Sequence, residues 1–256
     1  MHSRNDRTAL SVNLNKVALL RNQRDLEIPD VVRSAELCLD AGAHGLTLHP
    51  RPDRRHALPR DVRALSDLIH ARRRERAGLE LNIEGNPLPD FLELVASVKP
   101  DQCTLVPDAP DARTSSEGWD VAREGEQLQE IVKSLHALGI RVSLFMEPDL
   151  AQIQRVPETG ADRIELYTEP YASAYGTPRE AEITAQYAAC AKRAQELGLG
   201  VNAGHDLNLA NLGHFCREVP KILEVSIGHA ITADALELGW TAAVKAYLAA
   251  IEGAGR

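Results

Sequence analysis

The sequence predicts an α/β fold, a single (β/α)8 TIM barrel in which residues 1–256 form one domain. Short runs rich in β-branched residues alternate with longer helical runs along the whole chain, the pattern of a parallel sheet with crossover helices. There are eight such pairs, and each unit averages about 30 residues, the length of a βα unit. The length also matches a closed eight-unit barrel, which takes roughly 250 residues. The predicted strands are 9–15, 45–50, 79–84, 102–107, 141–147, 163–168, 199–204 and 223–230.

The helical runs between these strands carry start and stop signals. Pro29-Asp30 begins a run that closes at Gly42, and Leu88-Pro89-Asp90 begins one that stops at Pro100. Residues 119–139 place apolar side chains at helical spacing and end at a glycine. Further helices are predicted after Pro59, after Pro178 and over 233–253.

An open, doubly wound sheet is the alternative α/β fold. Its dinucleotide-binding form carries G-x-G-x-x-G after the first strand, and no such motif follows residues 9–15. Eight evenly spaced units favour closure into a barrel.

Composition and charge exclude several classes of protein. A hydrophobic content of 44% with 26% charged residues is typical of a globular domain rather than a disordered one. The net charge of −8 argues against a general nucleic-acid or membrane-surface binder, because both need a positive face. No apolar run reaches the ~20 residues of a membrane span, and the start lacks the apolar core of a signal peptide. The four cysteines, without CxxC spacing, are expected to be reduced thiols, so we expect a cytoplasmic protein.

Ionisable and amide side chains follow nearly every predicted strand. In such a barrel the carboxyl ends of the strands, with the loops after them, carry the active site. A purely structural barrel has no need for so many polar groups at one mouth. They are Asn13, Asn15, Lys16, His49, Arg51, Glu80, Glu84, Glu147, Glu165, His205 and His229.

Two segments predict phosphate binding. HPRPDRRH, at 49–56, places two histidines and three arginines in eight residues, and arginine is a natural partner of phosphate or carboxylate oxygens. Arg21 and Arg24 add cations near the same face. SIGHAITADAL, at 226–236, places a glycine between a strand and a helix start, the usual phosphate site of such barrels. A solvated basic loop is the alternative for 49–56.

Four groups from four strands suit acid–base chemistry: His49, Glu80, Glu165 and His205. Histidine titrates near pH 6.5 and can both take and give protons. The same four could instead bind a divalent metal, and Glu80 could simply face a polar layer of the barrel.

The loop 107–120, rich in Pro, Ser, Asp and Gly, is expected to be a lid over the site; an idle mobile loop is the alternative.

Together these motifs resemble the pyridoxine 5'-phosphate synthase family, the ring-closing enzymes of one vitamin B6 pathway. The most specific are HPRPDRRH at 49–56 and the pair NAGH at 202–205 and IGHAI at 227–231. The resembling segments run in order along essentially the whole chain: 12–24, 41–56, 60–65, 105–121, 142–149, 160–168, 201–207 and 226–231.

The resemblance implies a TIM barrel that assembles into a homo-octamer and uses no metal or organic cofactor. It implies the joining of 1-deoxy-D-xylulose 5-phosphate to 3-amino-2-oxopropyl phosphate, with loss of phosphate and water, to give pyridoxine 5'-phosphate. These small phosphorylated substrates are the partners it implies, with no nucleic acid and no membrane.

The resemblance also implies roles for individual residues. His49 and Glu80 match general bases, His205 the general acid, and Glu165 a group that steadies charge in the transition state. Positions that match substrate-binding residues are Asn13 and Arg24 for the aminoketone phosphate, Asn15, Lys16, Arg51, His56 and Ser115 for the deoxyxylulose phosphate, and Asp206, Gly228 and His229 for the phosphate grip.

Three positions depart from the commonest family pattern. Asn15-Lys16 stands where Asp-His is frequent, Asp206 stands where glycine is common, and one extra residue leaves Thr114 and Ser115 as alternatives for the lid contact. A phosphate-ligand binder without turnover is therefore one alternative function. A metal-dependent sugar-phosphate aldolase or isomerase is the other.

Overall fold

The computed structural model is a closed barrel of eight parallel strands, paired in the order β1 to β8 with β8 returning to β1. It describes residues 7–108, 115 and 117–254. The predicted fold class is therefore confirmed. The strands are β1 (Ala9–Asn13), β2 (Gly45–Leu48), β3 (Glu80–Gly85), β4 (Gln102–Leu105), β5 (Arg141–Met146), β6 (Arg163–Tyr167), β7 (Gly200–Gly204) and β8 (Glu224–Ile227).

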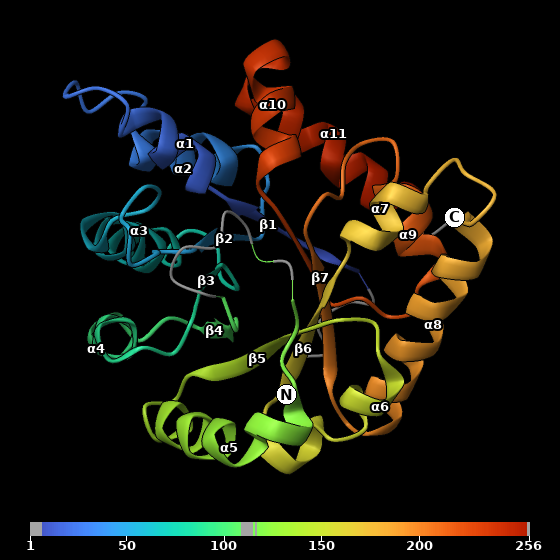
Figure 1. The fold of residues 1–256 in the computed structure, drawn as a ribbon. Helices are drawn as coiled ribbons and strands as arrows, with labels where there is room; N and C mark the ends of the chain where they lie inside the picture. The colour runs from blue at the N-terminus through green and yellow to red at the C-terminus, as the bar shows by residue number, and fades with distance from the viewer. Residues whose placement is uncertain (1–6, 109–114, 116, 255–256) are drawn as a thin grey trace.

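Helices surround the strands on the outside (Figure 1). Each predicted strand-to-strand connection carries at least one helix, and several carry two. The helices are α1 (Asn15–Arg21), α2 (Val31–Asp40), α3 (Pro59–Arg72), α4 (Pro89–Val98), α5 (Val121–Ala137), α6 (Leu150–Ile153), the 3₁₀ turn η1 (Val156–Thr159), α7 (Glu169–Ala174), α8 (Glu180–Glu196), α9 (Leu212–Glu218), α10 (His229–Leu238) and α11 (Trp240–Gly253). Among the described residues, no helix is both long and apolar enough to cross a bilayer.

The first strand is shorter than predicted. β1 ends at Asn13, and Asn15 already begins α1. The side chain of Asn13 causes this turn, because its Oδ1 accepts a hydrogen bond from the backbone N–H of Asn15 (3.0 Å). Asn15 and Lys16 therefore lie on the first turn of a helix rather than on a strand.

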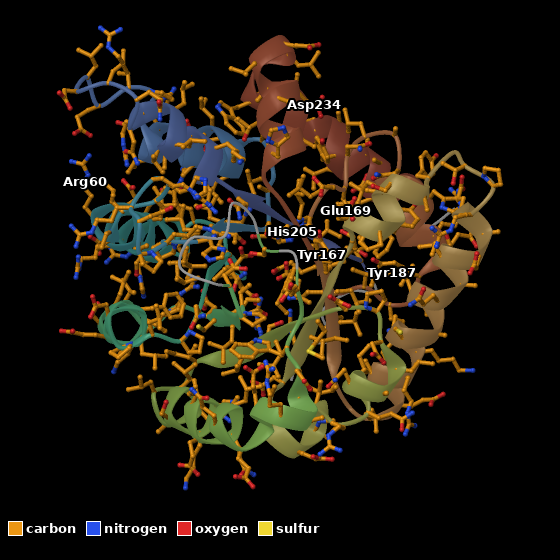
Figure 2. All side chains as sticks on the ribbon, in the orientation of Figure 1. Arg60, Tyr167, Glu169, Tyr187, His205 and Asp234 are labelled. Atoms are coloured by element: carbon orange, nitrogen blue, oxygen red, sulfur yellow. The ribbon has the colours of Figure 1, made fainter. Side chains whose placement is uncertain are left out.

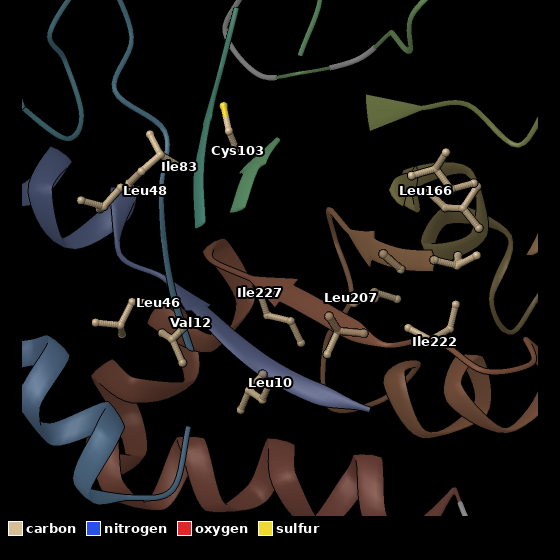
Figure 3. Close-up of a cluster of buried hydrophobic side chains, with 14 of the residues drawn as sticks. Leu10, Val12, Leu46, Leu48, Ile83, Cys103, Leu166, Leu207, Ile222 and Ile227 are labelled. Carbon is tan, nitrogen blue, oxygen red and sulfur yellow. The ribbon is translucent and has the colours of Figure 1, made fainter. Parts of the chain in front are cut away.

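The apolar core lies between the strands and the helices. Alternate strand residues such as Leu10, Val12, Leu46 and Leu48 are fully buried there, and Figure 3 shows part of this layer. All four cysteines are free thiols, as predicted. Burial raises the pKa of the Cys38 thiol to about 12, so this thiol stays protonated.

The residues that point toward the barrel axis are polar. The hydroxyls of Ser11 and Thr47 lie 2.7 Å apart, Thr104 donates to the amide oxygen of Asn82 (3.0 Å), and Asn202 donates to Gln102 (3.3 Å). Branched apolar side chains usually fill this space. Here a hydrogen-bonded interior leads directly to the carboxyl end of the barrel. The paired polar groups are Ser11, Thr47, Asn82, Gln102, Thr104 and Asn202.

A buried ion pair ties the first two βα units together. Arg21, at the end of α1, donates to both carboxylate oxygens of Asp61 in the first turn of α3 (2.5 and 2.9 Å), and both side chains are almost fully buried. Asp61 also accepts a hydrogen bond from the backbone N–H of Leu58 (2.8 Å). Arg21, predicted as a cation near the site, therefore holds the scaffold instead.

We predict that Asp61→Ala lowers the free energy of unfolding by about 3–5 kcal/mol, because it leaves the Arg21 guanidinium buried without its partner. Urea denaturation followed by circular dichroism measures this. Asp67→Ala, which removes an exposed carboxylate from the same helix, should change the free energy by less than about 0.5 kcal/mol. Equal losses in the two variants would contradict a structural role for the Arg21–Asp61 pair.

Candidate active site

A cavity of about 300 Å³ opens at the carboxyl ends of the strands. Its wall brings together residues that lie far apart in the sequence. Of the residues predicted for the site, it gathers Asn13, Asn15, Lys16, His49, Arg51, His56, Ser115, Glu165, His205, Asp206, Gly228 and His229. It also includes Glu84, which the sequence places among the polar residues at the strand ends but to which no role was assigned.

His49, the first residue after β2, lies between two buried carboxylates. Its Nδ1 is 3.8 Å from Oε2 of Glu84, and its Nε2 is 3.5 Å from Oδ2 of Asp108. The backbone N–H of His49 donates to Oδ1 of Asn15 (2.9 Å), which fixes the chain where β2 ends. At these distances a small rotation of either side chain brings the ring into hydrogen-bond range, so a proton can pass between imidazole and carboxylate.

Burial sets the protonation of this group. It raises the pKa of Glu84 to about 8, and the negative charges of Glu224 and Asp108 act in the same direction. Burial, together with the neighbouring Arg51 cation, lowers the pKa of His49 well below 6.5. At neutral pH the proton of the pair therefore lies on Glu84, and the imidazole is neutral.

Glu165 is a second buried acid, on β6. Burial and the negative charges of Glu84 and Glu224 raise its pKa well above the ordinary value. Its Oε2 has no hydrogen-bond partner among the described residues. A Cβ at Gly204, on the adjacent β7, would lie 2.4 Å from Oε1 of Glu165, so glycine there leaves room for the carboxyl group. Glu165 thus offers a protonated carboxyl to a group in the cavity.

His205 is held in a strained turn after β7. Its φ is +80°, a conformation that few non-glycine residues adopt and that is often found at functional sites. Its ring packs against Phe145 and Tyr167, with centroids 5.0 and 5.4 Å away, and Figure 2 shows Tyr167 and His205 side by side. Burial, followed by the Arg51 cation, lowers the pKa of His205 to about 4.

Cations and the imidazole of His56 form another part of the wall. Arg51 is buried and donates to Asp108 (2.6 Å). Burial and the cations of Arg55 and Arg51 lower the pKa of Lys16. Burial and the Lys16 charge lower that of His56 to about 4, and Nδ1 of His56 has no hydrogen-bond partner in the described part of the chain. Such a concentration of positive charge favours an anionic ligand.

The start of α10 forms a third part of the wall. Gly228 precedes the helix, and His229 is its first residue. A Cβ at Gly228 would lie 3.1 Å from the side chain of Asn13, so a larger residue would crowd the cavity. The backbone N–H groups of a first helical turn and the helix dipole both favour a phosphate.

Glu80 is not at this site, which corrects the prediction for that residue. It is the first residue of β3, opposite Gly45 at the start of β2, and it forms an ion pair with Arg141 (2.5 Å). Glu84 lies four residues along the same strand, about 13 Å further toward the carboxyl end. The alternative interpretation, that Glu80 faces a polar layer of the barrel, fits the structure.

Two other predicted residues lie elsewhere, and a third is not among the described residues. Arg24 is exposed and does not line the cavity. Glu147, predicted at a strand end, lines a separate pocket beside Tyr167. Thr114, like half of the predicted lid, lies outside the described residues, whereas Ser115 lines the cavity.

Two residues of the site were missed by sequence reasoning. Asn22 donates to the backbone carbonyls of Arg55 (3.0 Å) and His56 (2.7 Å) and so shapes the 49–56 loop. Asp108 contacts both His49 and Arg51. Asp108 lies just after the fourth predicted strand and within the resembling segment 105–121, but neither signal distinguishes it from its neighbours.

The raised pKa of Glu84 predicts how stability varies with pH. The folded state holds this proton up to about pH 8, whereas an unfolded glutamate loses it near 4.3. The folded state therefore binds more protons in this window, and Glu84 makes the protein less stable as the pH rises through it. Glu84→Gln should raise the free energy of unfolding, with a gain that grows from pH 5 to pH 8, measured by urea denaturation.

Glu80→Gln is the matched control on the same strand. It weakens the ion pair with Arg141 and should lower the free energy of unfolding by about 1–3 kcal/mol at each of these pH values. A Glu84→Gln gain that does not change with pH would show that Glu84 is ionised throughout.

Comparison with known proteins identifies the family of this chain. The family model described as pyridoxal phosphate biosynthesis protein PdxJ matches residues 10–253. A pyridoxine 5'-phosphate synthase from Albidiferax ferrireducens is 51% identical over 95% of this chain and 97% of its own length, and one from Porphyromonas gingivalis is 49% identical over 94% and 97%. Among solved structures, Mycobacterium tuberculosis tryptophan synthase aligns with a TM-score of 0.65 at 13% identity, over 96% of this chain and 93% of its own, a likeness of fold alone. The chain therefore belongs to the PdxJ family of pyridoxine 5'-phosphate synthases, enzymes of vitamin B6 biosynthesis, as its motifs predicted.

Proposed function

We propose that the cavity at the carboxyl end of the barrel condenses 3-amino-2-oxopropyl phosphate with 1-deoxy-D-xylulose 5-phosphate to give pyridoxine 5'-phosphate, phosphate and water. The observation that carries this proposal is the meeting of four groups, His49, Glu84, Glu165 and His205, in one cavity with cations and a helix N-terminus. The four ionisable groups suit repeated proton transfer. The cations and the helix N-terminus suit phosphorylated substrates.

The reaction requires several proton transfers. The amine of one substrate adds to the ketone of the other, and water leaves as the imine forms. Loss of a proton from carbon then permits phosphate to leave, and an aldol-type closure with a final dehydration makes the ring aromatic. Each step needs a base near a C–H or N–H group and an acid near a departing oxygen.

His49 and Glu84 are the proposed acid–base pair. The imidazole is neutral at pH 7 because its pKa is low, so it can accept a proton from the substrate. Glu84 begins protonated, since its pKa is about 8, and can donate to a departing oxygen before it acts as a base in a later step. Glu84 thus takes the role first predicted for Glu80.

His205 and Glu165 are proposed to act on the other side of the cavity. Burial and the Arg51 cation keep the pKa of His205 at about 4, but the negative charge of a bound phosphate raises the pKa of a nearby imidazole. Substrate binding would therefore supply the proton that His205 needs as general acid. Glu165, a buried neutral carboxyl, can donate a hydrogen bond to an oxygen that gains negative charge in the transition state.

The remaining residues are proposed to hold the substrates. Lys16, Arg51 and His56 would contact the deoxyxylulose phosphate, with Asn15 and Ser115 beside them. Asn13, Asp206, Gly228 and His229 lie around the start of α10, where the other phosphate would bind. We leave Arg24 out of this set because it is exposed away from the cavity. Octameric assembly remains a prediction from the resemblance, and a cytoplasmic location remains a prediction from composition and cysteine spacing.

The two alternative functions have weaker support. The four groups considered as metal ligands are not gathered, because Glu80 lies at the far end of the barrel. Within the described residues no cluster of three or more His, Cys, Asp or Glu side chains has metal-binding geometry. A binder without turnover would not require the buried acids Glu84 and Glu165 beside its ligand.

The proposed reaction is tested by mixing the chelator-treated protein with both substrates and following pyridoxine 5'-phosphate absorbance and free phosphate. We expect the two products to appear in equal amounts, and neither when one substrate is omitted. His205→Ala should reduce turnover by about 10²–10⁴-fold. Substrate binding without product would favour the binder, and activity that returns only with added metal would favour the metal-dependent alternative.

The assignment of Glu84 in place of Glu80 predicts opposite results for two matched variants. Glu84→Gln should lower kcat by about 10²–10⁴-fold, because the amide can neither donate nor accept the proton. Glu80→Gln should keep most of the wild-type kcat, since it changes an ion pair at the other end of the same strand. An inactive Glu80→Gln variant would contradict the assignment of Glu84 and support Glu80 as the general base that the resemblance implies.

A further inference from the structure

A buried carboxylate lies just behind the wall of the proposed active site. Asp108 follows β4 by three residues, its exposed fraction is 8%, and it does not line the cavity that holds Glu84, Glu165 and His205. It therefore has no direct access to a substrate in that cavity. Any part that it has in the reaction must act through its neighbours.

Three side chains of the site converge on one oxygen of Asp108. Its Oδ2 accepts hydrogen bonds from Nη2 of Arg51 (2.6 Å) and from Oγ of Ser115 (2.8 Å), and it lies 3.5 Å from Nε2 of His49. His49 and Arg51 come from the loop after β2, and Ser115 comes from the loop after β4. One atom thus links a proposed base to two proposed phosphate contacts.

Asp108 is itself held from a further strand. Its backbone carbonyl accepts a hydrogen bond from the side chain of Asn86 (2.7 Å), just after β3, and the backbone N–H of Val106 donates to Gly85 (3.0 Å). The carboxylate is therefore fixed with respect to β3 as well as β4. A carboxylate fixed in this way can restrain the more flexible side chain of Arg51, which donates a hydrogen bond to it.

We propose that Asp108 is a positioning residue for the synthase reaction, holding the Arg51 guanidinium and the Ser115 hydroxyl in place on the cavity wall and facing the Nε2 edge of His49. The inference rests on the proposed function. With Nε2 turned toward Asp108, the Nδ1 edge of His49 faces Glu84 and the cavity. The carboxylate also restrains the long Arg51 side chain before the reaction begins. Less conformational entropy is then lost when the guanidinium contacts the substrate in the transition state.

A purely structural role for the Asp108–Arg51 pair would lead to a different expected result. The Arg21–Asp61 pair has such a role, because it joins two helices and neither residue lines the cavity. Arg51 and Ser115, by contrast, both line it. If Asp108 acts through Arg51, its loss should reduce turnover in a correctly folded protein, and it should have little further effect once Arg51 is gone.

The test compares Asp108→Asn, Arg51→Met and the double variant, with Asp53→Asn as the matched control. Asp53 is exposed and pairs with Arg55 (3.2 Å), so its variant removes the same charge near the same loop without releasing Arg51. The steady-state kcat and KM are measured for each substrate. Calorimetric titration with pyridoxine 5'-phosphate gives the fraction of chains with an intact site.

We expect Asp108→Asn to lower kcat by about 10–100-fold, with a much smaller change in KM because the Arg51 cation is still present, and with full binding stoichiometry. Asp53→Asn should stay near the wild-type kcat. The double variant should be no slower than Arg51→Met alone. If Asp108→Asn does not fold, the double variant, which lacks both buried charges, supplies the same comparison with Arg51→Met.

Two results would overturn the inference. One is a wild-type kcat in Asp108→Asn, and the other is a double variant in which the two losses multiply, since Asp108 would then act independently of Arg51. A wild-type protein that forms no pyridoxine 5'-phosphate would instead contradict the proposed function, and with it the inference that rests on that function.

Discussion

Each strand of the barrel directs one set of side chains toward the helices and the alternate set toward the barrel axis. In this chain the outward set is apolar and the inward set is largely polar. The outward set supplies the free energy of packing. The inward set can therefore consist of hydroxyls, amides and carboxylates that pair with one another. The constraint is that inward polar groups need partners inside a closed cylinder; among the described residues, the Ser143 hydroxyl is an exception.

At the carboxyl end of the barrel, two side chains of the cavity wall have a polar atom without a partner in the described part of the chain. Nδ1 of His56 and Oε2 of Glu165 have no hydrogen-bond partner among the described residues, and both residues line the cavity. Lower in the barrel, Glu80 is paired with Arg141. A glutamate thus stabilises the fold through an ion pair at one end of the barrel, whereas a glutamate at the other end has an oxygen that can contact a ligand. Desolvation accounts for the difference, because an acid without a cation in a buried place keeps its proton.

The sequence was sufficient for the fold, the strand order along the chain and most of the cavity wall, because each depends on local patterns at strand ends. It was not sufficient for Glu80 and Glu84. The two residues share the inward face of β3, so strand alternation does not separate them, and the resemblance pointed to Glu80 although Glu84 lies nearer the carboxyl end of the strand. Asp108 could not be recognised either, because its partners are distant in the sequence. Arg51 lies 57 positions before it and Ser115 seven positions after it, and the fold brings both to its carboxylate.

The departure at Asn15-Lys16 has a physical explanation in the same geometry. Oδ1 of Asn15 accepts the backbone N–H of His49, and an aspartate oxygen could accept the same bond, so an amide preserves the support of the loop that carries His49. What changes is the charge. An amide removes a negative charge beside Lys16, Arg51 and His56, and Lys16 adds a positive one, which makes this wall more attractive to a phosphate. The pair therefore keeps the framework of the site while shifting its electrostatics toward the anionic substrates that the proposed reaction requires.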